Sequence, residues 1–191
     1  LGGAGNVANN LAALDISTTI ISVIGDDFNG NKIKELLNNN NINHHLILDN
    51  RPTTNKNRTY CQNKLLSRHD IETNQQINNS IENEIIVKLN EIIDQIDLVI
   101  FSDYMKGVLT NSLCTNIIQM CHMKNKPVFV DPKDPNHTKY IGCTLVKPNR
   151  NEAEYFIKRK INLDDQNDVL EALYKIKEMF KSQFCLLTLG E

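Results

Sequence analysis

The sequence predicts an α/β fold: a mostly parallel, doubly wound sheet flanked by helices, with a small antiparallel β lid. From residue 79 onward, short β-branched runs alternate with amphipathic segments and the connections are short, a pattern typical of a parallel sheet covered on both faces. Residues 45–70 instead show short runs with polar alternation, which indicates an antiparallel sheet. We therefore expect one domain over residues 1–191, with its lid at about 45–70.

The first part of the chain is predicted to alternate helix and strand. Val7, Leu11 and Leu14 share one face of a helix over residues 5–14. The β-branched run at 18–24 predicts a strand that ends at the turn residues of 25–27. Apolar residues at 33, 36 and 37 then indicate a second helix.

The second part repeats the same alternation. Apolar residues spaced by three and four from Ile81 to Ile96 predict a helix, with Asn79 as its N-cap and Glu82 three positions later. The remaining predicted elements are strands at 98–101, 128–130, 144–146 and 184–187, and helices at 110–123, 150–159 and 166–181.

Composition excludes several classes of protein. A net charge of −2 and a pI of 6.2 give no basic footprint for nucleic acid or a membrane surface. No apolar run approaches the roughly 20 residues that span a bilayer. The five cysteines include no C-x-x-C motif and are predicted to be buried thiols of a cytoplasmic protein. The spacing of His44, His45 and His69 fits no common zinc pattern.

Polar residues follow four of the predicted strands, where the carboxyl ends of a parallel sheet would meet at one edge. The residues are Asp103, Lys133, Asn149, Glu152, Thr188 and Gly190. Open α/β sheets bind ligands at that edge. The mixture of acids, lysine and glycine suits phosphoryl transfer, which needs cations, carboxylates for hydrated Mg²⁺ and backbone N–H groups. The alternative is that these are simply polar loops.

Three pairs of residues each have both a functional and a structural interpretation. Asn149 and Glu152 could hold a hydrated metal at a helix start, or could only form a capping box. Lys106 and Lys133 could supply charge, or could be solvated surface lysines. Lys56 and Arg58, two apart on an extended strand, could hold an anionic substrate group or protect an exposed edge strand.

The glycine-rich opening of the chain has two interpretations. Residues 3–8 fit G-x-G-x-x-A, with Asp26 or Asp27 at about the spacing of a ribose-binding acid, so an NAD-binding Rossmann oxidoreductase is an alternative. The strand that should precede this fingerprint is absent from the chain.

Taken together, the motifs resemble those of the ribokinase-like PfkB carbohydrate kinases. The matching stretches are 2–8, 25–30, 147–154 and 188–191. Within that family, four further stretches look like those of kinases that phosphorylate heptose 7-phosphate: 52–58, 65–70, 102–107, and 131–133 continuing to 140–145. The resemblance covers essentially the whole chain.

The resemblance implies MgATP-dependent phosphorylation of the anomeric hydroxyl of heptose 7-phosphate, a step toward ADP-heptose for the lipopolysaccharide core. Substrate-binding residues would be Gly2, Gly3, Asn6, Lys56, Arg58 and Asp103. ATP-binding residues would be Lys133, Asn149, Arg150, Asn151, Glu152, Thr188 and Gly190, with Glu152 also holding Mg²⁺.

The resemblance also implies that the domain is incomplete at both ends. The catalytic aspartate base would lie beyond Glu191, so we expect this chain alone to be inactive. A homodimer through the β lid is expected from related kinases. Alternatives within the family are kinases for ribose, fructose or a fructose phosphate, and an alternative from another class is a catalytically inactive sugar- or nucleotide-binding module.

Overall fold

The computed structural model describes residues 1–190, which form two compact units. The first unit comprises Leu1–Lys88 together with Lys106–Val108, and the second comprises Leu89–Met105 together with the chain from Leu109 onward. Each unit is described by itself.

The first unit is built on two parallel strands, β1 (Thr19–Gly25) and β2 (Asn43–Asp49), with Thr19 opposite Asn43. The helices α1 (Ala4–Ala13) and α2 (Phe28–Asn39) pack on this sheet. Their shared core joins Ala8, Leu37 and Ile42 to partly buried apolar residues of both helices and both strands. The predicted first helix and first strand are confirmed, each displaced by one residue.

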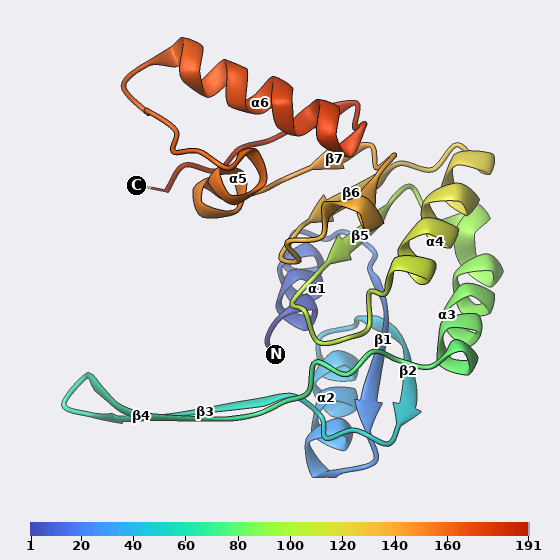
Figure 1. Cartoon of the computed structure of the whole chain (residues 1–191). Helices are drawn as coiled ribbons and strands as arrows, with labels where there is room; N and C mark the ends of the chain where they lie inside the picture. The colour runs from blue at the N-terminus through green and yellow to red at the C-terminus, as the bar shows by residue number, and fades with distance from the viewer. Residues whose placement is uncertain (191) are drawn as a thin grey trace. The chain divides into compact units, whose positions relative to one another are not determined.

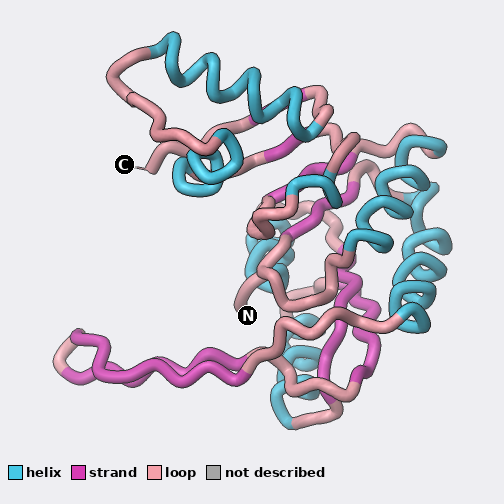
Figure 2. Tube along the Cα trace, in the orientation of Figure 1, coloured by secondary structure: helices cyan, strands magenta, loops and turns pink. Residues whose placement is uncertain are grey.

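The lid is a β-hairpin that extends from the first unit as a two-stranded arm (Figures 1 and 2). Its strands β3 (Asn55–Cys61) and β4 (Lys64–Ile71) pair antiparallel, with a register shift between Thr59 and Tyr60. Gln62 and Asn63, which connect the strands, have φ of 46° and 63°. Positive φ at both central residues is the geometry that matches the twist of a two-residue hairpin turn.

One stretch assigned to the lid from sequence belongs elsewhere. The apolar run at 46–48 lies in β2, where Leu46 packs on the core and Ile47 is buried. Short apolar runs suit either kind of sheet, and here burial beside β1 decides the outcome. The antiparallel strands therefore begin at Asn55.

The helix α3 (Asn79–Ile92) follows the lid. Its first turn is capped one residue earlier than predicted, because the N–H of Ile81 donates to Oδ1 of Asn78 at 3.0 Å. A short 3₁₀ helix, η1 (Ile93–Gln95), then leads into the sheet of the second unit.

The second unit contains a four-stranded sheet whose strands are all parallel and lie in sequence order. They are β5 (Val99–Ser102), β6 (Val128–Asp131), β7 (Leu145–Val146) and β8 (Phe184–Cys185). The connections contain the helices α4 (Asn111–Met123), η2 (His137–Tyr140), α5 (Arg150–Ile157) and α6 (Gln166–Phe180). This confirms the predicted alternation of parallel strands and helices.

The core of the second unit lies between this sheet and its helices. Val128, Val130 and Val146 are at most 1% exposed. Phe156 of α5 and Phe180 of α6 meet edge to face, with ring centroids 5.1 Å apart. Apolar packing against the helices therefore holds the sheet in place, and the polar residues lie at the ends of its strands.

Two other expectations concern the whole chain. Within residues 1–190, no helix has the length and apolar character needed to cross a bilayer. All five cysteines are free thiols; Cys114, Cys121 and Cys143 are buried, and Cys61 is exposed.

Candidate active site

The carboxyl edge of the second unit's sheet brings several predicted site residues together. Asn149 and Thr188 form a parallel bridge just beyond β7 and β8, and the N–H of Thr188 donates to the carbonyl of Pro148 at 3.1 Å. Lys133, just beyond β6, places its Nζ 3.4 Å from Oε1 of Glu152. Because parallel strands end at a common edge, residues far apart in sequence become neighbours there.

Asn149 and Glu152 form a reciprocal capping box at the start of α5. The N–H of Glu152 donates to Oδ1 of Asn149, and the N–H of Asn149 donates to Oε2 of Glu152, both at 2.9 Å. The structural alternative weighed from sequence is therefore present. It uses only Oε2, however, and leaves Oε1 facing Lys133.

The acidic groups of this edge fit a hydrated Mg²⁺ and no metal that needs several protein ligands. No group of three His, Cys, Asp or Glu side chains in residues 1–190 is placed to hold a metal. Mg²⁺ keeps several waters and binds through one or two carboxylates together with substrate phosphates. Oε1 of Glu152, which the capping box does not use and which lies 3.4 Å from Nζ of Lys133, is a ligand of that kind, on a side chain that is 15% exposed. Asp131 is already paired with Lys147 at 2.8 Å.

The remaining predicted nucleotide residues differ in their surroundings. Thr188, Gly190 and Asn151 are exposed, and a Cβ on Gly190 would meet nothing within 4 Å. The guanidinium of Arg150 instead donates to Glu154 at 3.0 Å and to the carbonyl of Ile161 at 3.2 Å. It would have to leave these partners to reach a nucleotide. Glu191 lies outside the described residues.

Glu154 is the acidic centre of that neighbouring network, which sequence reasoning did not single out. Hydrogen bonds from Lys160, from the N–H of Ile161 and from Arg150 hold the pKa of Glu154 down to about 2. The network ties α5 to the loop that leads to α6, so its role is to hold the helix whose first turn carries Glu152.

Asp103, predicted to contact substrate, is buried, with its side chain 4% exposed. Oδ1 accepts the N–H of Met105 at 2.7 Å, while Oδ2 accepts Nζ of Lys139 at 2.7 Å and the hydroxyl of Tyr140. Both carboxylate oxygens are thus occupied within the protein. Sequence reasoning missed Lys139, because a lysine in a polar stretch reads as a surface residue.

The predicted sugar-binding residues of the first unit lie at the start of α1. Gly3 precedes the helix with φ of 53°, and the N–H groups of Asn6 and Val7 donate to its carbonyl. Gly2 and Asn6 are exposed. The first N–H groups of a helix have no partner within it and can face a ligand.

The lid carries the other predicted substrate residues. Nζ of Lys56 lies 3.0 Å from Asp70 and 2.7 Å from Glu72. Arg58 is exposed opposite Arg68, so two like charges share one position of the ladder. Within residues 1–190, Arg58 makes no hydrogen bond or ion pair.

A second lysine reaches the base of the lid. Nζ of Lys106 lies 2.7 Å from Oε1 of Glu72, while Lys56 contacts Oε2 of the same carboxylate. The hydrogen bonds from Lys106 and then Lys56 lower the pKa of Glu72. Glu72 therefore neutralises part of the positive charge of both lysines.

The G-x-D-x-x-G turn at 25–30 anchors the first strand of the lid. Asp27 accepts the N–H groups of Gly30 at 2.7 Å and Thr53 at 2.8 Å, and Thr53 Oγ1 accepts the N–H of Gly25 at 2.9 Å. A Cβ on Gly25 would lie 2.2 Å from the carbonyl oxygen of Arg51. Glycine is required there by the close approach of another backbone segment.

The end of β4 is anchored as well. The N–H of Ile77 donates to the carbonyl of Gly107 at 2.9 Å, and Nη1 of Arg51 donates to the carbonyl of Lys106 at 3.0 Å. A Cβ on Gly107 would lie 1.9 Å from the carbonyl oxygen of Gln75. Residues 106–107 thus hold both stems of the lid at its base.

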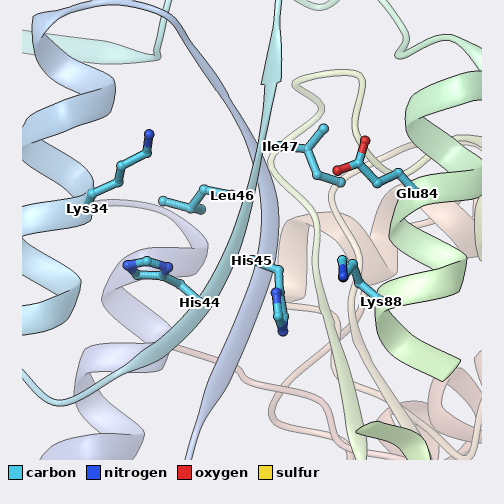
Figure 3. Close-up of a pocket in the computed structure, with 7 residues that line it drawn as sticks. All are labelled: Lys34, His44, His45, Leu46, Ile47, Glu84 and Lys88. Carbon is cyan, nitrogen blue, oxygen red and sulfur yellow. The ribbon is translucent and has the colours of Figure 1, made fainter. Parts of the chain in front are cut away.

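A hollow of about 260 Å³ lies along β2 in the first unit (Figure 3). Lys34 and His44 lie on the α2 side of the strand, and Glu84 and Lys88 on the α3 side. None of the predicted site residues lines it.

Comparisons with known proteins agree with this arrangement. The model of the pfkB family carbohydrate kinases matches residues 1–191. The chain is 38% identical over 191 residues to the bifunctional protein HldE of a Nitratiruptor species and 37% identical over 193 residues to that of Sulfurimonas denitrificans. Each match covers 100% of the chain and 40% of the relative, so the chain spans less than half of these relatives' length.

Solved structures confirm the fold. Phosphofructokinase-2 from Escherichia coli, in complex with substrates and products, superposes with a TM-score of 0.77 at 19% identity. The match covers 99% of the chain and 61% of that protein. The predicted fold class is thereby confirmed, including the lid as a small antiparallel sheet.

Proposed function

The chain belongs to the pfkB family of carbohydrate kinases, and we propose that it is part of a kinase that transfers the γ-phosphoryl group of ATP to the anomeric hydroxyl of heptose 7-phosphate. The observation that carries the nucleotide half of this proposal is the convergence of Lys133, Asn149, Glu152 and Thr188 at one sheet edge. The product would be a precursor of ADP-heptose for lipopolysaccharide.

The choice of sugar rests on two observations. Residues 52–58, 65–70, 102–107 and 131–133 resemble those of heptose 7-phosphate kinases. The HldE proteins are 38% and 37% identical to the chain over its whole length. The alternative substrates are ribose, fructose and a fructose phosphate, and the test below compares them with heptose 7-phosphate.

Catalysis of phosphoryl transfer is mainly positioning and charge stabilisation. Lys133 would approach the transferred phosphates, and the backbone at Thr188 and Gly190 would border the nucleotide. Oε1 of Glu152 would hold a water of hydrated Mg²⁺ while Oε2 keeps the helix cap. Bound Mg²⁺ supplies neutralisation of charge on the phosphate oxygens.

The sugar would be held from the first unit. Gly2, Gly3 and Asn6 would contact its hydroxyls at the start of α1. Lys56 and Arg58 would hold the 7-phosphate, where a bidentate guanidinium is well suited to a phosphate.

The lid also supports a homodimer as part of the proposal. Tyr60, Leu65 and Leu66 are 60%, 52% and 66% exposed near the tip of the hairpin. Exposed apolar residues grouped in this way are typical of interaction surfaces. A cytoplasmic location is proposed with it, on the basis of the free thiols.

The test is an ADP-release assay on the full-length protein with heptose 7-phosphate, fructose 6-phosphate, fructose and ribose. We expect the highest kcat/KM for heptose 7-phosphate. A higher value for another sugar would replace the proposed substrate. Thermal protection by NAD and not by ATP would overturn the assignment of the nucleotide site.

A further inference from the structure

Lys139 is a buried cation that the mechanism above does not use. Its side chain is 4% exposed in the 3₁₀ helix η2. Lysine is almost never fully buried unless it is paired, because removing its charge from water is costly. The environment of this side chain therefore requires an explanation.

The ammonium of Lys139 is saturated by three acceptors. Its Nζ lies 2.7 Å from Oδ2 of Asp103 and 2.8 Å from Oδ2 of Asp134, and it donates to the carbonyl of Leu109 at 2.9 Å. An ammonium has three donors, and these three acceptors match them in number.

The three acceptors belong to different loop positions of the second unit. Asp103 follows β5 and begins the stretch 103–107. Asp134 directly follows Lys133, beyond β6, and Leu109 directly precedes Thr110, the N-cap of α4. One side chain thus joins the loop after β5, the loop after β6 and the start of a helix.

The hydrogen bonds around Asp103 fix the backbone of its loop. The hydroxyl of Tyr140, a residue with no exposed surface, donates to Oδ2, the oxygen that also accepts Lys139. Oδ1 accepts the N–H of Met105, which has a left-handed φ of 54°. A non-glycine residue in that region persists only when its surroundings hold it there.

Charge balance makes the lysine necessary for this arrangement. Burial lowers the pKa of Lys139, but its hydrogen bonds to Asp103 and Asp134 outweigh burial and raise the pKa overall. Burial raises the pKa of Asp134, but the interaction with Lys139 and the hydrogen bond from the N–H of Asn136 together outweigh it and lower the pKa overall. Without the ammonium, two carboxylates would face each other with no cation between them.

We propose that Lys139 is a positioning residue of the kinase. It holds the loop that carries Asp103 and the loop that carries Lys133 in a fixed position relative to each other. This inference rests on the proposed function, because the resemblance to sugar kinases assigns Asp103 to the sugar and Lys133 to the nucleotide. Misplacement of reacting groups by about 1 Å can cost about 100-fold in rate. A tether between the two loops therefore affects the rate even though it touches neither substrate.

The experiment compares Lys139→Met and Lys139→Arg with the wild type in the full-length protein. Methionine keeps the aliphatic stem and removes the charge, whereas arginine keeps the charge with a different geometry. We expect kcat to fall about 100-fold for Lys139→Met and less for Lys139→Arg, with KM for ATP changed less than about threefold. Lys124→Met is the matched control, because Lys124 pairs with Asp94 at 3.0 Å on the surface of the same unit.

A second readout separates positioning from loss of folded protein. The ratio of ADP released to sugar phosphate formed does not change when part of a sample is unfolded. We expect this ratio to rise above that of the wild type in Lys139→Met, because misaligned loops let water compete with the sugar. If Lys139→Met does not fold, Lys139→Arg, which keeps the charge but changes its geometry, provides the same measurement.

The outcomes are distinct. A folded Lys139→Met or Lys139→Arg with wild-type kcat and an unchanged ratio overturns the positioning role. If the wild type prefers another sugar, the proposed substrate is wrong and the Lys139 comparison is made with that sugar. If the wild type phosphorylates no sugar, both the proposed function and this inference are overturned.

Discussion

Oδ2 of Asp27 accepts a hydrogen bond of 2.8 Å from the backbone N–H of Thr53, 26 positions later in the chain. The same carboxylate accepts the N–H of Gly30 at the start of α2. One acidic side chain therefore joins the first turn of a helix to the segment that enters the lid. This relationship explains how a short turn motif is coupled to the lid.

Asp27→Asn should destabilise the protein at neutral pH by about 1 kcal/mol, the size of a partly exposed charge-assisted hydrogen bond. The hydrogen bond from the N–H of Thr53, followed by that from Gly30, lowers the pKa of Asp27 below its ordinary 3.8. The ionised carboxylate thus contributes stability above about 3.8, and this contribution is lost as pH falls through its lower folded-state pKa. Urea unfolding of the full-length protein from pH 7 to pH 3 measures both effects.

The control for Asp27 is its exposed neighbour, Asp26→Asn. The difference between wild type and Asp27→Asn should shrink as the pH approaches 3, whereas Asp26→Asn should follow the wild type throughout. Equal behaviour of the two variants would show that the hydrogen bond to Thr53 does not support the fold.

Gly25→Ala should lower the melting temperature by more than Asp27→Asn does. Its new methyl group would lie 2.2 Å from the carbonyl oxygen of Arg51 and 3.0 Å from the N–H nitrogen of Thr53. Relief requires movement of backbone, and forced overpacking of this kind costs about 1–3 kcal/mol. Gly5→Ala in α1 is the matched control, because its methyl would meet Leu1 at an ordinary 3.4 Å. A thermal melt in which both variants match the wild type contradicts the tight approach at Gly25.

Glu152→Gln should reduce kcat about 10- to 100-fold and raise the Mg²⁺ concentration needed for half-maximal rate, with little change in KM for the sugar. Glutamine can still accept the N–H of Asn149, so the cap of α5 is kept while the charge is lost. Steady-state kinetics across a Mg²⁺ titration measures this, with exposed Glu171→Gln on α6 as control. An unchanged kcat and Mg²⁺ requirement would leave Glu152 with the capping role alone.

Glu72→Gln should lower KM for an anionic sugar about two- to fivefold, the size expected from an exposed ion pair. Glu72 contacts both Lys56 and Lys106, so under the proposed function its charge would compete with a substrate phosphate for both. The gain should shrink as salt is raised, because exposed charges are screened. Glu35→Gln, whose carboxylate pairs only with Lys32 on α2, serves as control. A KM that rises in Glu72→Gln would show that the carboxylate orders the lysines for binding.

Among the five cysteines of residues 1–190, Cys61 should be the thiol that reacts fastest. It is exposed, whereas burial raises the pKa of Cys143 to about 12 and those of Cys121 and Cys185 to about 11. Since the thiolate is the reactive form, the buried thiols react slowly. Titration with a disulfide reagent near pH 8 should lose one fast equivalent in Cys61→Ser and none in Cys185→Ser. Loss of a fast equivalent in the second variant would contradict the burial.

Much of the candidate site could be predicted from local pattern alone. Residues 128–133 read as a buried run followed by polar residues, and so do residues 144–149. Parallel strands end at a common edge, so the proximity of Lys133 to Glu152 follows from the alternation of strand and helix. The capping box at Asn149 and Glu152 is likewise a short-range feature with a recognisable spacing.

What the sequence determined by itself was the order of helices and strands and the residues that follow each strand, because these depend on short-range periodicity and turn chemistry. The family followed from the resemblance of its motifs to those of known kinases. The tertiary structure decided three further features. Residues 46–48 belong to the parallel sheet with β1, Asp27 accepts a hydrogen bond from the N–H of Thr53, and Lys139 is buried between Asp103 and Asp134. Each of these depends on contacts between residues distant in the chain. A lysine or a short apolar run has the same local signature whether it faces water or a buried partner, and only packing distinguishes the two.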